Sequence, residues 1–439
     1  MRIYFYLYSV MKLFLLIGIV FFSSHAFSQT CDVSLGSKTL YKPLQSKYTS
    51  PPKGYEAVFI NHVNRHSARH LTKDVSTSAA YQLLAFADSA NLLTTEGKRL
   101  YNMLVSFQKV EHPSIKNISD TGRSELKAIA TRMYRNQRTV FSKNATVSVR
   151  FTKEIRTEQS ADVFTDALKT LIGTRFHIET KWANDTTLRF FDRSPAYLKY
   201  EEGDWHQSLD SLATSLKAGD ISQALSKRIF TQIPISKLFQ TKLSQLAADL
   251  FGFGTIAPSV YKEALAQGVT QQDINFLSFF TCEETRALSQ LDEAEDYLAK
   301  GPARNSLGIQ TTIAAPLLAD FLNTTDSFIK NKKIQARLRF AHAETIAPFA
   351  ALLQLKGASE VCTDLSQLKN CWDASTIIPL SSNIQWILYK DKSNKYLVKT
   401  LLNEKEVAIA GLKIKLFPYY AWDDVRIFYK KLLQKIPAS

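Results

Sequence analysis

The 439-residue sequence has no second long apolar segment: after residues 13–22, no stretch approaches the length that a membrane-spanning helix needs. The first apolar run lies between Lys12 and the small residues of Ala26-Phe27-Ser28, with Arg2 further upstream. Positive charge, a short apolar core and small residues, in this order, are typical of a cleaved export signal. We therefore predict a signal peptide over residues 1–28 and an exported protein, periplasmic or secreted, without a membrane span.

Signatures of nucleic-acid binding are also missing, because there is no zinc-finger spacing, no aromatic RNA-binding motif and no clean basic helix. The charge is nevertheless one-sided: 55 Lys and Arg stand against 40 Asp and Glu, a net charge of +15. Loss of Arg2 and Lys12 with the signal peptide leaves +13. Such an excess favours a polyanionic partner, and without nucleic-acid motifs we expect a phosphorylated small molecule or an anionic surface.

Cysteines are few, but all four lie beyond the predicted signal peptide. An even number in an exported protein favours disulfides, and four cysteines allow three pairings. We expect Cys362 to pair with Cys371 across a short polar loop. Cys31 would then pair with Cys282 and join the amino terminus to a helical region. The alternative is that these are buried free thiols.

A cluster of cations follows a short predicted strand near the amino terminus. Val58, Phe59 and Ile60 form an apolar run, and Arg65, His66 and Arg69 come shortly after it. Open α/β sheets place ligand sites at the carboxyl ends of their strands. Two guanidinium groups can each grip two phosphate oxygens while the imidazole attacks phosphorus. The pattern therefore indicates phosphate chemistry.

Two other interpretations of the same residues stay open at this point. His62, His66 and His70 are spaced four apart and would form a metal-binding face if they lay on a helix. The β-branched and aromatic residues before them, preceded by glycine and proline, argue against that helix. The residues could also form a basic surface loop without a function.

A second strand-to-helix junction follows at residues 146–172. Thr146–Phe151 alternates as a strand does, and the next helix is predicted to begin with Thr157 as its N-cap. Arg156 lies at this helix start, where free N–H groups and a partial positive charge favour phosphate. Arg156 is thus a candidate third clamp. The apolar face of the helix is predicted to comprise Ala161, Phe164, Leu168 and Leu171.

A third junction carries a carboxylate. Arg337–Ala341 is predicted to be a strand, and His342-Ala343-Glu344-Thr345 opens the helix after it. His342 is a candidate phosphate ligand, and Glu344 is a candidate general acid for the leaving oxygen. The alternative for Glu344 is that it only complements the dipole of the helix.

The remaining segments predict an α/β protein, with a core sheet flanked by helices and a mostly α-helical inserted domain. We expect the core to comprise residues 29–184 and 331–439, and the helical insertion residues 185–330. The tail contains three candidate strands, Ile384–Lys390, Lys395–Leu402 and Glu406–Leu416, and Asp423 is predicted to cap a terminal helix.

The three junctions together resemble the histidine phosphatase superfamily, acid phosphatase branch, and within it the multiple inositol polyphosphate phosphatases, which are phytases. Arg65-His66-Ser67-Ala68-Arg69 matches the first family motif except at its glycine, and His342-Ala343-Glu344-Thr345 matches the late motif. Arg156–Ala161 is similar to the middle arginine motif, and Leu188–Asp192 to the strand and turn that follow it. Asp296–Gly301 and Asn403-Glu404 are weaker similarities.

The resemblance implies a phosphohistidine mechanism without a metal or cofactor. His66 would be the nucleophile and Glu344 the proton donor, while Arg65, Arg69, Arg156 and His342 would bind the phosphate. The implied substrates are inositol hexakisphosphate and its lower forms. One alternative is a broad-specificity acid or sugar phosphatase. The other is an inositol phosphate-binding protein with impaired turnover, because serine at position 67 would be strained if the motif needs a positive φ.

Overall fold

The computed structural model describes residue 31 and residues 33–142, 144–234 and 236–436, so the predicted signal peptide lies outside the described residues. The chain divides into two units, Met1–Asp32 and Val33–Ser439. All the described helices and strands belong to the second unit. None of the described helices is long and apolar enough to cross a membrane.

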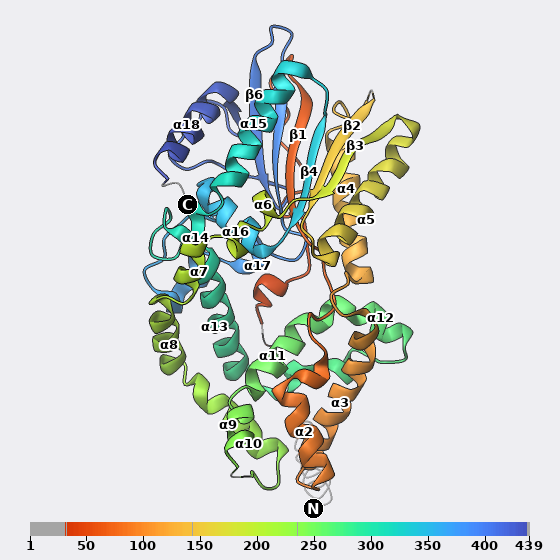
Figure 1. Ribbon diagram of the computed structural model, residues 1–439, viewed down its shortest axis with the longest axis vertical. Coiled ribbons are helices and arrows are strands. Elements are labelled where there is room, and N and C mark those ends of the chain that lie inside the picture. The colour runs from red at the N-terminus through yellow and green to blue at the C-terminus, as the bar shows by residue number, and fades with distance from the viewer. Residues whose placement is uncertain (1–30, 32, 143, 235, 437–439) are drawn as a thin grey trace, which may run out of the picture. The chain divides into compact units, whose positions relative to one another are not determined.

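A mixed sheet forms the centre of this unit (Figure 1). Its strand order is β3-β2-β4-β1-β5-β6-β7, with β8 paired to β6. Strands β3, β2, β4 and β1 are parallel, whereas β5 and β6 run antiparallel to their neighbours. The strands are β1 (Glu56–Arg65), β2 (Ala145–Phe151), β3 (Phe176–Ala183), β4 (Ala336–Ala341), β5 (Asn383–Lys390), β6 (Tyr396–Leu402), β7 (Lys405–Glu406) and β8 (Tyr419–Ala421).

The carboxyl ends of the three central parallel strands meet at one edge of the sheet. In the register, Arg65 of β1 lies opposite Ala341 of β4, and Phe151 of β2 lies opposite Phe340. The segments after all three strands therefore start side by side, as the strand-to-helix junctions predict.

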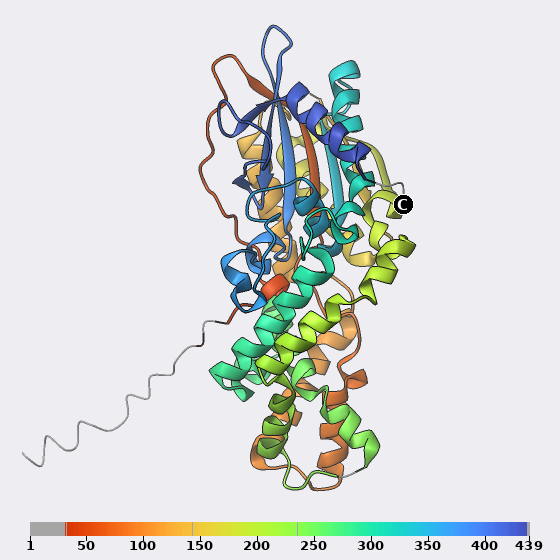
Figure 2. The ribbon, with the colours of Figure 1, turned by 90° about the vertical axis from the view of Figure 1, so that its left-hand side faces the viewer.

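Helices cover both faces of the sheet, which explains why β1 is buried along most of its length. Helices α4 (Asp120–Asn136) and α5 (Ile155–Ile172) pack on one face through residues such as Ile129 and Phe164. Helices α15 (Ala315–Asn331), α16 (Ala343–Leu352) and α18 (Trp422–Gln434) cover the other, and Figure 2 shows α15 and α18 together on one side of the strands. The predicted α/β class with flanking helices is confirmed.

A second apolar cluster is mostly helical. Its residues come from two parts of the chain, about 75–110 and 221–287. It contains residues of α2 (Ala79–Ser89), α3 (Thr95–Glu111), α9 (Ala218–Ile229), α10 (Lys237–Leu243), α11 (Leu246–Ile256), α12 (Tyr261–Ala266) and the start of α13 (Cys282–Lys300). The remaining described α-helices are α6 (Asp185–Leu188), α7 (Pro195–Glu201), α8 (Trp205–Ser215), α14 (Ile309–Thr312) and α17 (Ala374–Ile377).

The buried apolar residues of the predicted insertion, residues 185–330, belong partly to the helical cluster and partly to the core beside the sheet. Its part from 221 to 287 belongs to the helical cluster, while Leu188–Leu212 and Ala294–Phe328 contribute to the core beside the sheet. Helix α15 lies directly on β1, where Asn61 Nδ2 donates to Phe321 O over 3.0 Å. The domain boundaries at residues 184 and 331 stay a prediction.

Two expectations for strands are wrong. Residues 406–416 do not form a continuous strand: only Lys405–Glu406 belongs to a strand, and the backbone of Ala408 and Ala410 bonds to the loop after α16 instead. Leu188–Asp192 is helical, and the strand there is β3, at Phe176–Ala183. β3 is an edge strand with mostly exposed residues. Its Phe176, Ile178 and Trp182 do alternate with polar residues, a signal that the sequence prediction did not use.

Two helix caps also differ from the prediction. Helix α5 begins after Glu154, so Thr157 is its third residue, and its hydroxyl donates back to the carbonyl groups of Thr152 and Glu154. The predicted apolar face of α5 is also wrong at its end, because Leu171 is exposed and the next residue, Ile172, is buried. Ala421, not Asp423, is the N-cap of α18.

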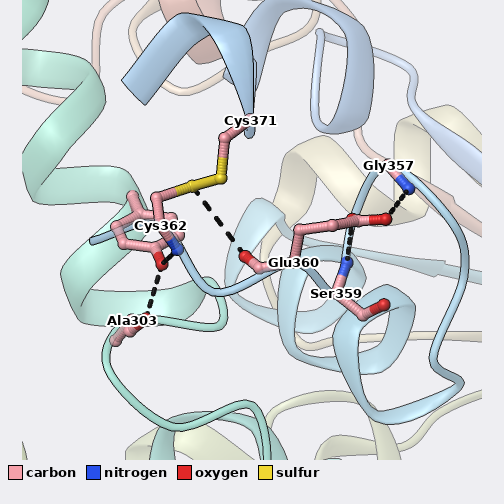
Figure 3. Close-up of a disulfide and its surroundings, with 7 residues drawn as sticks. Ala303, Gly357, Ser359, Glu360, Cys362 and Cys371 are labelled. Carbon is pink, nitrogen blue, oxygen red and sulfur yellow. Dashed lines mark hydrogen bonds between the residues drawn. A yellow bond between two sulfur atoms is a disulfide. The ribbon is translucent and has the colours of Figure 1, made fainter. Parts of the chain in front are cut away.

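The predicted disulfide between Cys362 and Cys371 is present (Figure 3). Beside it, the hydroxyl of Tyr297 on α13 accepts a hydrogen bond from Cys362 N and donates one to Ala303 O. Each of the other two cysteines, Cys31 and Cys282, is also in a disulfide, and no described cysteine is free. Through the hydrogen bonds of Tyr297, the loop closed by Cys362 and Cys371 is attached to the last turns of α13.

Candidate active site

The end of β1 presents Arg65 and His66 at the shared edge of the sheet. Arg65 is the last residue of β1, and its backbone N–H donates to Ser382 O, while that of His66 donates to Ala341 O. Both residues are thus held between β4 and β5 by the sheet itself. Rigid strand ends of this kind fix side chains more closely than free loops do.

His66 is oriented by the residue after it. Its Nδ1 lies 3.1 Å from Ser67 O, and because a carbonyl oxygen only accepts, Nδ1 carries the proton. The lone pair is therefore on Nε2. Burial and the three nearby guanidinium groups hold the pKa of His66 well below its ordinary value, so the imidazole is neutral and nucleophilic.

Three arginines surround this imidazole. Arg65 donates to Ser37 O and to Ile378 O, Arg69 donates to His70 O, and Arg156 pairs with Glu154 over 2.7 Å. The Nε of each is buried and, within the described part of the chain, has no hydrogen-bond partner. Burial and the other two guanidinium groups lower the pKa of Arg69 to about 10. Such crowding of positive charge favours an anion between the arginines.

His342 faces His66 across the site. The two ring centroids are 5.7 Å apart, and His342 is the N-cap residue of α16. Its Nδ1 lies 3.4 Å from Arg156 Nη2, a donor, so the proton is on Nε2, which lies 2.9 Å from Thr152 Oγ1. Burial, together with nearby Arg156, lowers the pKa of His342 to about 3 although Glu344 acts in the opposite direction.

Glu344 is the second residue of α16 and is 38% exposed. Its Oε1 lies 3.6 Å from the Nζ of Lys300 on α13. Partial burial opposes ionisation, but Lys300 and His342 outweigh it and lower the pKa of Glu344 to about 2. The carboxyl group is therefore ionised in the free protein, next to the positive cluster.

The structure thus gathers all six residues singled out in the sequence around one position. These are Arg65, His66, Arg69, Arg156, His342 and Glu344, from the junctions after β1, β2 and β4. Their individual roles remain predictions.

His62 and His70 lie elsewhere, because residues 56–65 are a strand and not a helix. His62 is fully buried against Phe164 and Phe340, whereas His70 lies between Glu111 and Glu263. The three histidines therefore do not share the face that the metal interpretation requires. Within the described ranges, no group of three His, Cys, Asp or Glu residues is arranged to hold a metal ion.

The sequence prediction gave several residues at the site no role there. Lys300 and Asp296 come from α13, within the segment Asp296–Gly301 that was noted only as a weaker similarity. Glu154 accepts from both Arg156 and Arg189. Glu125 of α4 accepts from Ala68 N, inside the first motif.

Comparison with known protein families identifies the family of the chain. Residues 58–403 match the family model of the histidine phosphatase superfamily (branch 2). No curated protein matches the sequence significantly.

Solved structures share the fold at low sequence identity. The Bifidobacterium longum multiple inositol polyphosphate phosphatase in complex with inositol hexasulfate matches with a TM-score of 0.76 and 20% identity, over 89% of this chain and 96% of that one. The D. castellii phytase matches with a TM-score of 0.63 and 13% identity, over 92% and 85%. The Hafnia alvei phytase in complex with myo-inositol hexakis sulphate matches with a TM-score of 0.51 and 13% identity, over 88% and 98%.

Proposed function

The chain belongs to the histidine phosphatase superfamily, branch 2, and is a phosphatase. On this premise we propose that it is an exported enzyme that hydrolyses inositol hexakisphosphate and lower inositol polyphosphates through a phosphohistidine. One observation carries the proposal: three arginines surround a neutral His66 whose Nδ1 bonds to Ser67 O, which leaves Nε2 as the nucleophilic atom. The family relationship and the inositol hexasulfate complex of the B. longum protein support it.

In the first step, His66 Nε2 attacks phosphorus and the bond between phosphorus and the inositol oxygen breaks. Arg65, Arg69 and Arg156 hold the phosphoryl oxygens and offset their charge in the transition state. Glu344 transfers a proton to the leaving oxygen, and the products are the alcohol and phosphohistidine.

In the second step, Glu344, now a carboxylate, accepts a proton from water, and the hydroxide attacks phosphorus. The bond from phosphorus to Nε2 breaks, so inorganic phosphate leaves and His66 is restored. The cycle consumes one water and needs no metal or other cofactor.

Glu344 must hold a proton before it can act as the acid. Its pKa is low in the free protein because Lys300 and His342 stabilise the carboxylate. A bound phosphate adds negative charge beside it, which raises the pKa and favours the protonated form. Substrate binding and protonation of Glu344 are therefore linked.

The charge of the protein suits a substrate with several phosphates. The net charge is +15, or +13 without the predicted signal peptide, and a field of this sign attracts a polyanion over long distances. A broad-specificity acid or sugar phosphatase would use the same catalytic residues, and product analysis over inositol phosphates, sugar phosphates and aryl phosphates would separate the two.

The remaining alternative was a binding protein in which Ser67 prevents turnover. Ser67 is not among the described residues with a positive φ. Serine therefore occupies the position of the family glycine without backbone strain, which favours an active enzyme.

The decisive experiment is phosphate release from inositol hexakisphosphate by the mature protein, with and without EDTA, beside His66→Ala and Glu344→Gln. We expect release that survives EDTA, is abolished in His66→Ala and falls by about 100-fold or more in Glu344→Gln. Phosphate binding without any release between acidic and mildly basic pH would overturn the proposal.

A further inference from the structure

Lys300 places an ammonium group between two carboxylates at the edge of the site. Its Nζ lies 2.6 Å from Asp296 Oδ1 and 3.6 Å from Glu344 Oε1. Lys300 is the last residue of α13, and Asp296 is one turn earlier on the same helix. Lys300 therefore links α13 to the candidate proton donor on α16.

Two of these three charges, Lys300 and Asp296, are largely shielded from water. The side chain of Lys300 is 16% exposed and that of Asp296 is 8% exposed. A charge withdrawn from water interacts more strongly with its neighbours than a surface charge does. Asp296 and Glu344 therefore share the ammonium group of Lys300.

The last turn of α13 is itself fixed. At Gly301, directly after Lys300, the backbone packs so tightly on the helix end that an added β-carbon would stand 2.8 Å from Tyr297 O. Tyr297 accepts a hydrogen bond from Cys362, the first cysteine of the bridged loop (Figure 3). The disulfide loop thus supports the turn that carries Asp296 and Lys300.

Resting on the proposed function, we propose that Lys300 is a positioning residue for Glu344, which it holds at the leaving oxygen and whose carboxylate it stabilises. In the first step Glu344 loses its proton to the leaving oxygen, and the new carboxylate lies beside the ammonium of Lys300. In the second step the carboxylate takes a proton from water. Lys300 keeps its own proton throughout.

Other charged or titratable groups also face Glu344, and each would contribute to its titration. They are His342 on the same helix, Arg65 at the end of β1, Arg69 after it, and Tyr197 and Glu201 on α7. Lys300 differs from the other cations because it makes the closest described ion pair with the Glu344 carboxylate.

A rival role for Lys300 is to bind a second phosphate of the substrate. The two roles differ in their dependence on the leaving group. A nitrophenolate leaves without help from an acid, whereas an alkoxide needs a proton. A phosphate-binding lysine would matter for inositol hexakisphosphate and not for any monophosphate.

The test compares Lys300→Met and Lys300→Arg with Lys431→Met, a control at an exposed lysine of α18. The substrates are inositol hexakisphosphate, glycerol 2-phosphate and p-nitrophenyl phosphate. We expect Lys300→Met to lower kcat/KM by about 10-fold or more for both alkyl substrates and much less for the nitrophenyl ester. Lys300→Arg should restore most of the loss, and Lys431→Met should match the unaltered protein.

The pH profile gives a readout that a purely structural role would not change. Without the ammonium, Glu344 holds its proton to higher pH, so the high-pH limb of kcat/KM should move to higher pH in Lys300→Met. If Lys300→Met does not fold, Asp296→Asn tests the same idea. Lys300 would then pair with Glu344 alone and stabilise its carboxylate more strongly, so the high-pH limb of kcat/KM should move to lower pH.

Three results would overturn the inference: an equal loss for all three substrates, a loss confined to inositol hexakisphosphate, or no loss at all. Absence of hydrolysis by the unaltered protein would instead overturn the proposed function on which the inference rests.

Discussion

The hydroxyl of Ser67 lies against Gly122, the third residue of α4. A β-carbon added at Gly122 would stand 2.4 Å from Ser67 Oγ and 2.2 Å from Ala68 O. The loop that carries His66 thus packs so closely on the start of α4 that only glycine fits at position 122. Serine in the first motif and glycine in the helix are therefore structurally coupled.

Gly122→Ala is expected to displace the nucleophile loop. The added methyl group meets the backbone of Ala68, which cannot turn away as a side chain would, so we expect a loss of about 1–3 kcal/mol in the free energy of unfolding. Phosphatase activity should fall as well. Urea unfolding and initial rates measure both effects.

Gly219→Ala is the matched control, because Gly219 is also a helical glycine and a β-carbon there meets nothing within 4 Å. Alanine should be neutral or slightly stabilising at this position. Equal behaviour of the two variants would show that the contact with Ser67 and Ala68 is unimportant.

Ser67→Gly tests whether the departure from the family motif limits turnover. Because Ser67 has no positive φ, glycine relieves no strain there. We expect kcat of the same order as in the unaltered protein and a loss of about 0.5–1 kcal/mol in stability from the greater freedom of the unfolded chain. A rise in kcat of about 10-fold or more would mean that serine impairs catalysis after all.

Glu125→Gln is expected to loosen the first motif. The buried Glu125 carboxylate accepts hydrogen bonds from Tyr41 N, Ala68 N and Ser381 Oγ, so an amide would place its own N–H groups against donors. Each donor left unsatisfied costs about 1–3 kcal/mol. Unfolding in urea and kcat should both report the change, and Glu158→Gln, at an exposed site on α5, provides the comparison. If the two variants were equally stable and active, Glu125 would have no such role.

His62→Phe is expected to make the protein less sensitive to acid. Burial, with Arg339 nearby, lowers the pKa of His62 to about 3 from an ordinary value of 6.5. Between these values the unfolded chain binds a proton that the folded protein does not, so stability falls as the pH falls. The phenyl ring can keep the stacking on Phe164.

The quantity to compare is the free energy of unfolding of His62→Phe minus that of the unaltered protein. We expect this difference to be about 2–3 kcal/mol more favourable to His62→Phe at pH 4 than at pH 7. Denaturant unfolding at several pH values measures the slope. His177→Phe, at an exposed position of β3, should keep the slope of the unaltered protein. An unchanged slope in His62→Phe would contradict the prediction.

Removal of the bridge with Cys362→Ser and Cys371→Ser should lower the free energy of unfolding by about 3 kcal/mol or less, because the closed loop is short. It should also reduce activity, since Tyr297 contacts the loop and lies on the turn of α13 before Lys300. A stability loss with fully retained kcat would show that the loop does not support the site.

The order of residues along the chain was enough to predict which of the candidate residues would lie together. Strand-to-helix junctions of parallel strands meet at one edge of a sheet, so the motifs around His66, Arg156 and Glu344 had to converge once the sheet formed. The pairing of Cys362 with Cys371 was also predictable, because the loop between them is short. These features depend on local pattern and on general rules of α/β topology.

The errors have a local cause. The apolar residues of 406–416 alternate, but the backbone of Ala408 and Ala410 bonds to residues 354–356 and not to a strand. Strand β3 lies at the edge of the sheet, and its short alternation of Phe176, Ile178 and Trp182 with polar residues is a weak signal that the prediction passed over. Apolar alternation reports burial, and it does not say which backbone groups will pair.

The sequence by itself determined which residues the strand-to-helix junctions bring together; the tertiary structure decided which contacts they make. Only the fold shows that Ser67 O orients His66, that Gly122 makes room for Ser67, and that Lys300 comes from a helix in a distant part of the chain to lie beside Glu344. Such relationships arise from packing between segments far apart in sequence. No local pattern encodes the distance between two side chains that only the folded core brings together.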